Sequence, residues 1–196
     1  MNAVNELRDM IALDVKAGYD TREQIINNAI DLLMGEYHPD WLEEQATQLT
    51  DKALQDHFDD QQLWKHDTDC DKLDEAFAEL DRHGIVARQH FTCCQTCGHS
   101  EINQQIKETA IHRPVYGYVF FHWQDTESAV RSEYLYLAYG AVNGKEDESL
   151  NIAANVVAAL ERAGLEVDWN GTVQRRICIK NIAWQRRRVM EDLKLA

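Results

Sequence analysis

The chain has 196 residues, 44% of them hydrophobic, and a formal net charge of −14 at pH 7. This length is enough to bury a hydrophobic core, and the sequence contains neither an apolar run that could span a membrane nor a secretory signal, so we expect a cytoplasmic protein. The acidic balance argues against nucleic acid and anionic membranes as partners, because an acidic surface repels phosphate groups.

The beginning of the chain has the pattern of an acidic helical region. Apolar residues recur at helical spacing in residues 4–11, 26–33 and 42–53. The negative charge is concentrated in the same part of the chain, since residues 1–80 hold 20 Asp and Glu against 6 Lys and Arg. We therefore predict an acidic α-helical subdomain over residues 1–66.

From residue 67 onward the pattern alternates between helices and strands. A capping box at Thr68 begins a helix that ends near Gly84. The elements that follow are strand 85–91, helix 98–110, strands 116–122 and 134–141, helix 146–163, and strands 165–169 and 173–179. That order predicts an α+β domain over residues 67–196, built as a ferredoxin-like βαββαβ sandwich with one added edge strand. Asn170-Gly171 predicts a two-residue type I′ turn in the last hairpin.

The first predicted βαβ connection brings two polar segments together. A right-handed crossover makes strands 85–91 and 116–122 parallel, so their C-terminal ends share one edge of the sheet. We expect that edge to gather residues 93–99 and residues 122–127. Any composite site in the chain depends on this arrangement.

Five cysteines occur in the chain, an odd number that indicates reduced thiols rather than a disulfide framework. Cys93, Cys94 and Cys97 lie in the segment FTCCQTCGHSE, at the predicted turn from strand to helix. One interpretation is a dithiol redox site, in which the start of the helix lowers the pKa of the Cys94 thiol and Cys97 resolves the mixed disulfide.

Two other interpretations of these cysteines remain open. In a zinc site, Cys94 and Cys97 provide half of a tetrahedral ligand set, and the shared sheet edge adds His122 together with His99, Cys93 or Asp125. In the third interpretation the cysteines are small, largely buried and inert residues that fill a tight turn.

The segment FFHWQDTE contains the second candidate site. His122, Asp125 and Glu127 leave a strand end together, which suits acid–base chemistry or carboxylate ligation. The same residue types are also ordinary capping and first-turn residues of helices. The sequence has no phosphate-binding glycine loop, G-x-S-x-G elbow or HExxH motif, so it does not decide whether the protein is an enzyme.

Four segments between residues 68 and 184 resemble a family of bacterial proteins known only as a domain of unknown function. They are the CCxTCG cluster, the FHxQDTE segment, the YLAYGA strand and the WNG turn. The resemblance implies no activity, substrate or catalytic residue. The acidic segment before residue 67 resembles the family more loosely.

The charge distribution favours one functional prediction over the others. We predict a non-enzymatic binding or regulatory protein whose partner is a basic protein. The alternative is a thiol site, either structural zinc or dithiol redox, that uses Cys94 and Cys97. The acidic face could instead only keep the protein soluble, or it could face a basic cluster of this chain, which consists of Arg175, Arg176, Lys180, Arg186, Arg187 and Arg188.

Overall fold

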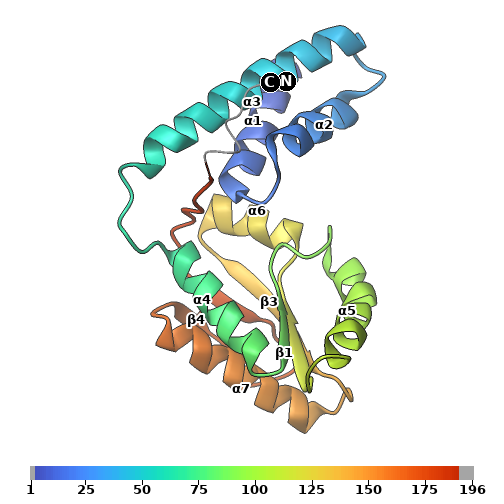
Figure 1. The fold of residues 1–196 in the computed structure, drawn as a ribbon, viewed down its shortest axis with the longest axis vertical. Helices are drawn as coiled ribbons and strands as arrows, with labels where there is room; N and C mark the ends of the chain where they lie inside the picture. The colour runs from blue at the N-terminus through green and yellow to red at the C-terminus, as the bar shows by residue number, and fades with distance from the viewer. Residues whose placement is uncertain (1–2, 190–196) are drawn as a thin grey trace. The chain divides into compact units, whose positions relative to one another are not determined.

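The computed structural model describes residues 3–189, which fall into two compact units (Figure 1). The helical unit comprises Met1–His66 with Gln185–Ala196, and the α+β unit comprises Asp67–Trp184. The sequence analysis placed residues 67–196 in one domain, whereas residues 185–189, the last that the structure describes, belong to the helical unit. Within residues 3–189, none of the helices combines the length and the apolar composition needed to cross a bilayer.

The helical unit confirms the helices predicted for the beginning of the chain. Helices α1 (Ala3–Ala17), α2 (Arg22–Leu33) and α3 (Pro39–Gln61) pack around a shared apolar core. α2 begins at a capping box, in which the Thr21 N–H group donates to Gln24 Oε1 at 2.8 Å. Each helix contributes one apolar stripe to the core, which includes Leu7, Ile11, Val15, Ile25, Ala29, Leu42, Ala46 and Leu54.

Residues 185–189 join the helical unit through hydrogen bonds to its backbone. The Arg188 side chain is 5% exposed and donates to the carbonyl oxygens of Val15 at 3.0 Å and Asp20 at 2.8 Å. The last carbonyl groups of α1 have no partner within the helix, and a cation at a helix C-terminus is also favoured by the helix dipole. His57 Nε2 lies 3.0 Å from the Arg186 carbonyl oxygen. Part of the predicted basic cluster therefore lies within the acidic helical unit.

The α+β unit is a mixed sheet with helices on both faces (Figure 1). Its strand order within the described residues is β1-β2-β3-β5-β4. The two faces alternate along one strand, since Gly117 packs against Ile152 and Tyr118 lies against His99. The elements are α4 (Asp69–Arg82), β1 (Ile85–Arg88), α5 (Gln95–Ala110), β2 (Gly117–Phe120), α6 (Trp123–Ser132), β3 (Leu135–Ala141), α7 (Glu146–Arg162), β4 (Glu166–Asp168) and β5 (Ile177–Lys180). The predicted α+β class is confirmed.

The ferredoxin-like connection is not confirmed. In the split βαβ plan another strand lies between the two parallel strands, whereas here β1 and β2 pair directly, with Ile85 opposite Gly117 and Arg88 opposite Phe120. The sequence analysis assigned no helix to the span between β2 and β3. That span forms α6, because His122 and Asp125 build a capping box that starts a helix there.

The two-residue hairpin turn predicted at Asn170-Gly171 is wrong. β4 and β5 are antiparallel with Asp168 opposite Cys178, so residues 169–176 form a longer connection between them. This loop is held against β3, because the Tyr139 hydroxyl donates to the Thr172 carbonyl oxygen at 2.9 Å and accepts from the indole N–H group of Trp169 at 3.1 Å. The tertiary contact with Tyr139 overrides the local turn preference.

Candidate thiol site

The cysteine cluster occupies the turn between β1 and α5. Cys94 is the N-cap residue of α5, with extended backbone angles (φ −155°, ψ 170°), and Cys97 lies in the first turn of the helix. Gly98 lets this turn approach the sheet closely, since a Cβ atom at that position would lie 2.4 Å from the Phe120 ring. The sheet therefore fixes the position of the helix start that carries the thiols.

The turn before the cysteines is held by the segment that the sequence analysis placed beside it. The Phe91 N–H group donates to the Phe121 carbonyl oxygen at 2.8 Å, and the Trp123 N–H group donates to the Thr92 carbonyl oxygen at 3.1 Å. His90 and Thr92 adopt left-handed backbone angles (φ 49° and 64°), which non-glycine residues rarely adopt. Because this conformation costs energy, the contacts with the neighbouring segment hold the turn in place.

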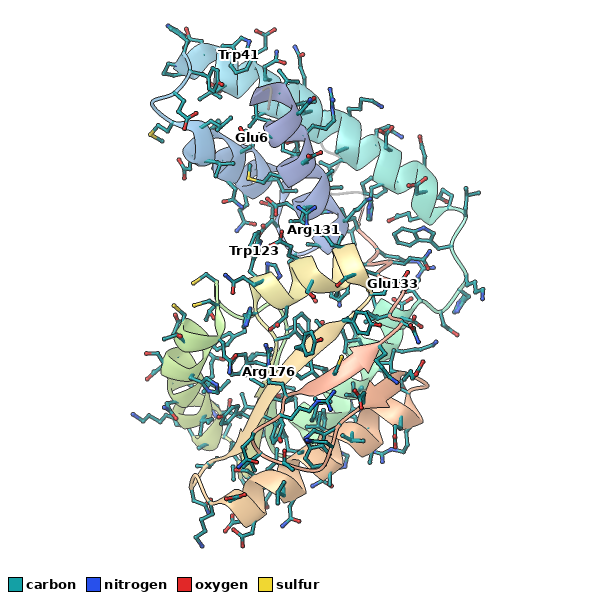
Figure 2. The ribbon with its side chains drawn as sticks, turned by 180° about the vertical axis from the view of Figure 1, so that it is seen from behind. Glu6, Trp41, Trp123, Arg131, Glu133 and Arg176 are labelled. Carbon is teal, nitrogen blue, oxygen red and sulfur yellow. The ribbon has the colours of Figure 1, made fainter. Side chains whose placement is uncertain are left out.

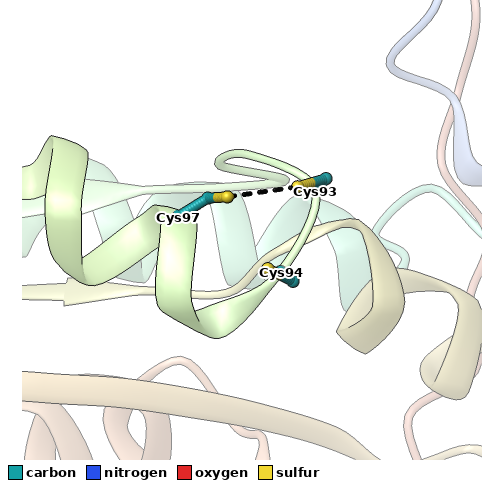
Figure 3. Close-up of side chains that lie close together, drawn as sticks. All are labelled: Cys93, Cys94 and Cys97. Carbon is teal, nitrogen blue, oxygen red and sulfur yellow. Dashed lines mark hydrogen bonds between the residues drawn. The ribbon is translucent and has the colours of Figure 1, made fainter.

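The three thiols of the cluster lie close together (Figure 3). The sulfur atoms of Cys93, Cys94 and Cys97 all lie within 4.8 Å of one another, and Cys93 Sγ is 3.4 Å from Cys97 Sγ. Cys93 is exposed, and Cys94 and Cys97 are half-buried. The burial expected in the third interpretation is therefore not found for Cys93 and is only partial for Cys94 and Cys97. Such burial is found for the other two cysteines, which are 1% and 4% exposed: Cys70 and Cys178.

The environment shifts the pKa values of the two CxxC thiols, Cys94 and Cys97, in opposite directions. The pKa of the Cys94 thiol is lowered, chiefly by the backbone N–H group of Cys97 and then by the thiols of Cys97 and Cys93. The Cys94 side chain makes no well-formed capping hydrogen bond, so the amide groups act on it mainly through their dipoles. Interactions with the thiols of Cys93 and Cys94 raise the pKa of Cys97 to about 11. The thiolate therefore forms first on Cys94.

The start of α5 has no competing negative charge in its own first turn. Among the helices within residues 3–189, α5 alone has no acidic residue there, whereas α4, α6 and α7 each have at least one. A helix N-terminus stabilises negative charge, and an acidic side chain usually provides it. At the N-terminus of α5, a thiolate can provide the negative charge that an acidic side chain provides in the other helices.

The histidine and aspartate candidates do not join the thiols. Within the described residues, the ligand group around the thiols consists of the three sulfur atoms and includes neither His99, His122 nor Asp125. His122 and Asp125 are both 4% exposed and bind each other, with His122 Nε2 3.1 Å from Asp125 Oδ2. Burial lowers the pKa of His122 below its ordinary value; the Asp125 carboxylate opposes this shift, and the charge of nearby Arg176 adds to it. These side chains build the start of α6, which positions the thiol turn. Glu127, the third candidate of this segment, forms an exposed ion pair with Arg131.

Arg176 contributes to this corner and was not identified as a site residue from the sequence (Figure 2). Its Nη2 atom donates to Asp125 Oδ2 and to the Tyr136 carbonyl oxygen, each at 2.6 Å. The sequence analysis counted it only as part of a basic cluster, because its partner lies 51 positions away in the chain. No local pattern in the sequence signals a pairing of this kind.

Comparison with known proteins identifies the family of the chain. No curated protein and no solved structure matches it. A family model described as "Domain of unknown function (DUF6891)" matches residues 1–188. The match includes the helical unit as well as the region that carries the resemblance noted above, and it ends inside the described C-terminal segment. The chain therefore belongs to the domain-of-unknown-function family DUF6891.

Proposed function

We propose that the protein carries out thiol–disulfide exchange at the start of α5, with Cys94 as the attacking thiol and Cys97 as the resolving thiol. The observation that supports this most directly is the convergence of three free thiols within 4.8 Å of one another at a solvent-accessible helix N-terminus. Reactive cysteines lie in such partly exposed positions at helix starts, whereas structural cysteines are buried.

The exchange proceeds in two steps that conserve atoms and electrons. The Cys94 thiolate attacks one sulfur of a disulfide substrate, the substrate S–S bond breaks, and one substrate thiolate leaves while Cys94 holds the other half as a mixed disulfide. Cys97 then loses its proton and attacks the Cys94 sulfur, which releases the second substrate thiol and forms the Cys94–Cys97 disulfide. The substrate is thereby reduced by two electrons, and an external dithiol returns the protein to its reduced form.

The surrounding structure suits this chemistry. Gly98 and the Phe120 ring keep the helix start against the sheet, and the backbone bonds from Phe91 and Trp123 hold the preceding turn. The sulfur atoms already lie within 4.8 Å of one another, and this proximity favours the second step of the exchange. The separated acidities of Cys94 and Cys97 match the roles of attacking and resolving thiol.

The test is to trap the mixed disulfide. In a Cys97→Ser variant treated with glutathione disulfide, glutathione should remain attached to Cys94, and peptide mass spectrometry locates it. A Cys178→Ala variant is the matched control, because it removes a buried thiol and keeps the cluster, so it should form the internal disulfide and release glutathione. If Cys94 stays unmodified in the Cys97→Ser variant, the proposal fails.

Zinc is a second candidate, because thiolates are preferred zinc ligands and three thiols converge here. The described residues place no fourth protein ligand in the group, so a zinc ion at this position would keep one coordination site for solvent. That arrangement differs from a closed structural zinc site. Elemental analysis of protein purified without chelator tests this candidate, since one zinc per chain, lost in a Cys94→Ser variant, would support it.

A basic protein partner is a separate proposal, based on charge. α3 exposes many acidic side chains, among them Glu43, Glu44, Asp56, Asp59 and Asp60. Salt screens attraction between exposed charges, so binding of a basic partner through this helix should weaken steeply as ionic strength rises. A Glu43→Lys, Glu44→Lys double variant should reduce the binding of a purified basic partner, and unchanged binding would count against this helix as the docking surface.

A further inference from the structure

Cys93 forms and breaks no bond in the proposed exchange reaction, although its thiol contributes to the difference in acidity between Cys94 and Cys97. Cys94 and Cys97 are sufficient to attack a disulfide and to resolve the mixed disulfide. Cys93 is exposed, so it does not fill the core, yet its sulfur lies only 3.4 Å from the sulfur of Cys97. A third thiol at this distance has a chemical use that a CxxC pair alone does not have.

The three sulfur atoms are spaced as ligands of one ion would be. A thiolate lies about 2.3 Å from a bound zinc ion, so two thiolates on a tetrahedral ion are about 3.8 Å apart. Cys93 Sγ lies 3.4 Å from Cys97 Sγ, and every sulfur pair in the group lies within 4.8 Å. Small rotations about the Cα–Cβ bonds are therefore enough for all three sulfurs to contact one ion.

The ligand set also restricts which ion fits. Within residues 3–189 the group contains sulfur ligands and neither histidine nitrogen nor carboxylate oxygen. Thiolate ligands select soft ions, whereas Mg²⁺, Ca²⁺ and Mn²⁺ prefer oxygen. Zinc is most often held by four protein ligands, while three sulfur ligands complete the coordination of a three-coordinate soft ion. Three thiolates at one point also need a site without nearby acids, and the first turn of α5 has none.

We propose that the reduced thiols of Cys93, Cys94 and Cys97 form a three-coordinate site for a soft, thiophilic ion such as trivalent arsenic or monovalent copper. Arsenous acid, As(OH)₃, exchanges its three As–O bonds for three As–S bonds, and each hydroxyl leaves as water with the proton of one thiol. One monovalent copper ion takes the place of the three thiol protons, which pass to the solvent, so the occupied site carries a net charge of −2. Neither reaction changes an oxidation state, so neither needs an oxidant or a reductant.

The ion site uses the thiols of the proposed exchange reaction but stands on the position of Cys93, which that reaction does not need. An ion bound by Cys94 and Cys97 and a disulfide between them exclude each other, because both occupy the same sulfur atoms. Binding of the ion should therefore block exchange. Substitution of Cys93 separates the two activities, since it removes the third ligand and leaves the CxxC pair.

The experiment titrates the fully reduced, full-length chain with arsenite and counts the thiols that stay protected from alkylation. We expect one arsenic per chain and protection of the three clustered thiols, with Cys70 and Cys178 inaccessible until the protein unfolds. A Cys93→Ser variant should bind arsenite at least about tenfold more weakly and protect two thiols, and circular dichroism should show an unchanged fold because Cys93 is exposed.

A second titration with monovalent copper, in competition with a chromogenic copper(I) chelator, distinguishes the two ions. Binding of either ion that weakens at least tenfold in Cys93→Ser supports the proposal and identifies the ion. Equal affinities of the wild type and Cys93→Ser for both ions, or no binding of either, would overturn it. The exchange assay on Cys93→Ser is read separately, since retained exchange with weakened ion binding supports both proposals, and lost exchange contradicts only the assigned roles of Cys94 and Cys97.

Discussion

Two neighbouring turns from strand to helix are built in opposite ways. At the turn from β2 to α6, the N-cap His122 and Asp125 satisfy each other and the backbone, both are buried, and Arg176 binds Asp125 from outside the turn. At the turn from β1 to α5, the N-cap Cys94 makes no capping hydrogen bond, and its thiols are accessible to solvent. We call the turn from β2 to α6 the closed turn and the turn from β1 to α5 the open turn. The closed turn contributes to stability and supports the open turn, which carries the reactive thiols.

The largest expected effect comes from breaking the closed turn. Asp125→Ala removes the carboxylate that accepts from the His122 N–H group at 3.1 Å and from Arg176 at 2.6 Å. Loss of one partner of a buried ion pair typically costs about 3–5 kcal/mol, so the free energy of unfolding should fall by about 3 kcal/mol in urea denaturation. Glu127→Ala on the same helix is the control, because its ion pair with Arg131 is exposed and should contribute less than about 1 kcal/mol. Equal losses in the two variants would contradict the description of this turn.

The next effect comes from disturbing the packing beneath the open turn. Gly98→Ala places a methyl group 2.4 Å from the Phe120 ring, which is fully buried. Overpacking of this kind costs about 1–3 kcal/mol and outweighs the gain of up to about 1 kcal/mol from the better helix propensity of Ala. The variant should be less stable in denaturation, and Ser100→Ala, at an exposed position of the same helix, should not be. A stabilised Gly98→Ala variant would show that α5 is not fixed by this contact.

A smaller effect on stability should accompany loss of the reactive thiol itself. Cys94→Ala removes a side chain that makes no capping hydrogen bond, so the free energy of unfolding should change by less than about 0.5 kcal/mol. The same variant should lose the mixed disulfide with glutathione completely. A large loss of stability would instead assign Cys94 a structural role in starting α5, comparable to that of His122 in α6.

The smallest effect is a shift along the pH axis. Because the neighbouring groups lower the pKa of Cys94 and raise that of Cys97 to about 11, alkylation of Cys94 should reach half its maximal rate at a lower pH than alkylation of Cys97. Iodoacetamide labelling across a pH series, resolved by peptide mass spectrometry, measures both rates. Cys97→Ala should move the Cys94 profile only slightly to higher pH, since it removes the Cys97 thiol but keeps the Cys97 backbone N–H group, which lowers the pKa of Cys94 the most. Coincident profiles for the two thiols would contradict the assigned order of reactivity.

The sequence predicts those parts of the fold that depend on local patterns. The helical stripes of the first 66 residues, the capping box at Thr68 and the parallel pairing of β1 with β2 follow from periodicity, capping residues and the handedness of a crossover. α6 was missed because the sequence analysis considered the residues at its start, His122 and Asp125, as candidate site residues and did not continue a helix from them. The loop 169–176 was missed because its conformation depends on Tyr139, which is distant in the chain.

The candidate site was predicted only in part, because only some of its features follow from a local pattern in the sequence. The spacing of Cys94 and Cys97 at the start of a helix is local, and so the dithiol was identified from the sequence. Whether His99, His122 or Asp125 would join the thiols depended on side-chain directions, which the strand order does not determine. His122 and Asp125 face each other and Arg176 instead. The membership of residues 185–189 in the helical unit likewise rests on contacts of Arg188 with α1, a pairing across almost the whole chain.

The contrast between the open and the closed turn is tested most directly by mapping the disulfide that forms under mild oxidation. The reduced chain is equilibrated with a glutathione redox buffer, remaining thiols are alkylated, and the linked peptides are identified by mass spectrometry. A disulfide between Cys94 and Cys97, with Cys70 and Cys178 still reduced, is the expected result. A chain in which Cys94 and Cys97 remain reduced throughout, or in which Cys70 or Cys178 is oxidised first, would contradict it.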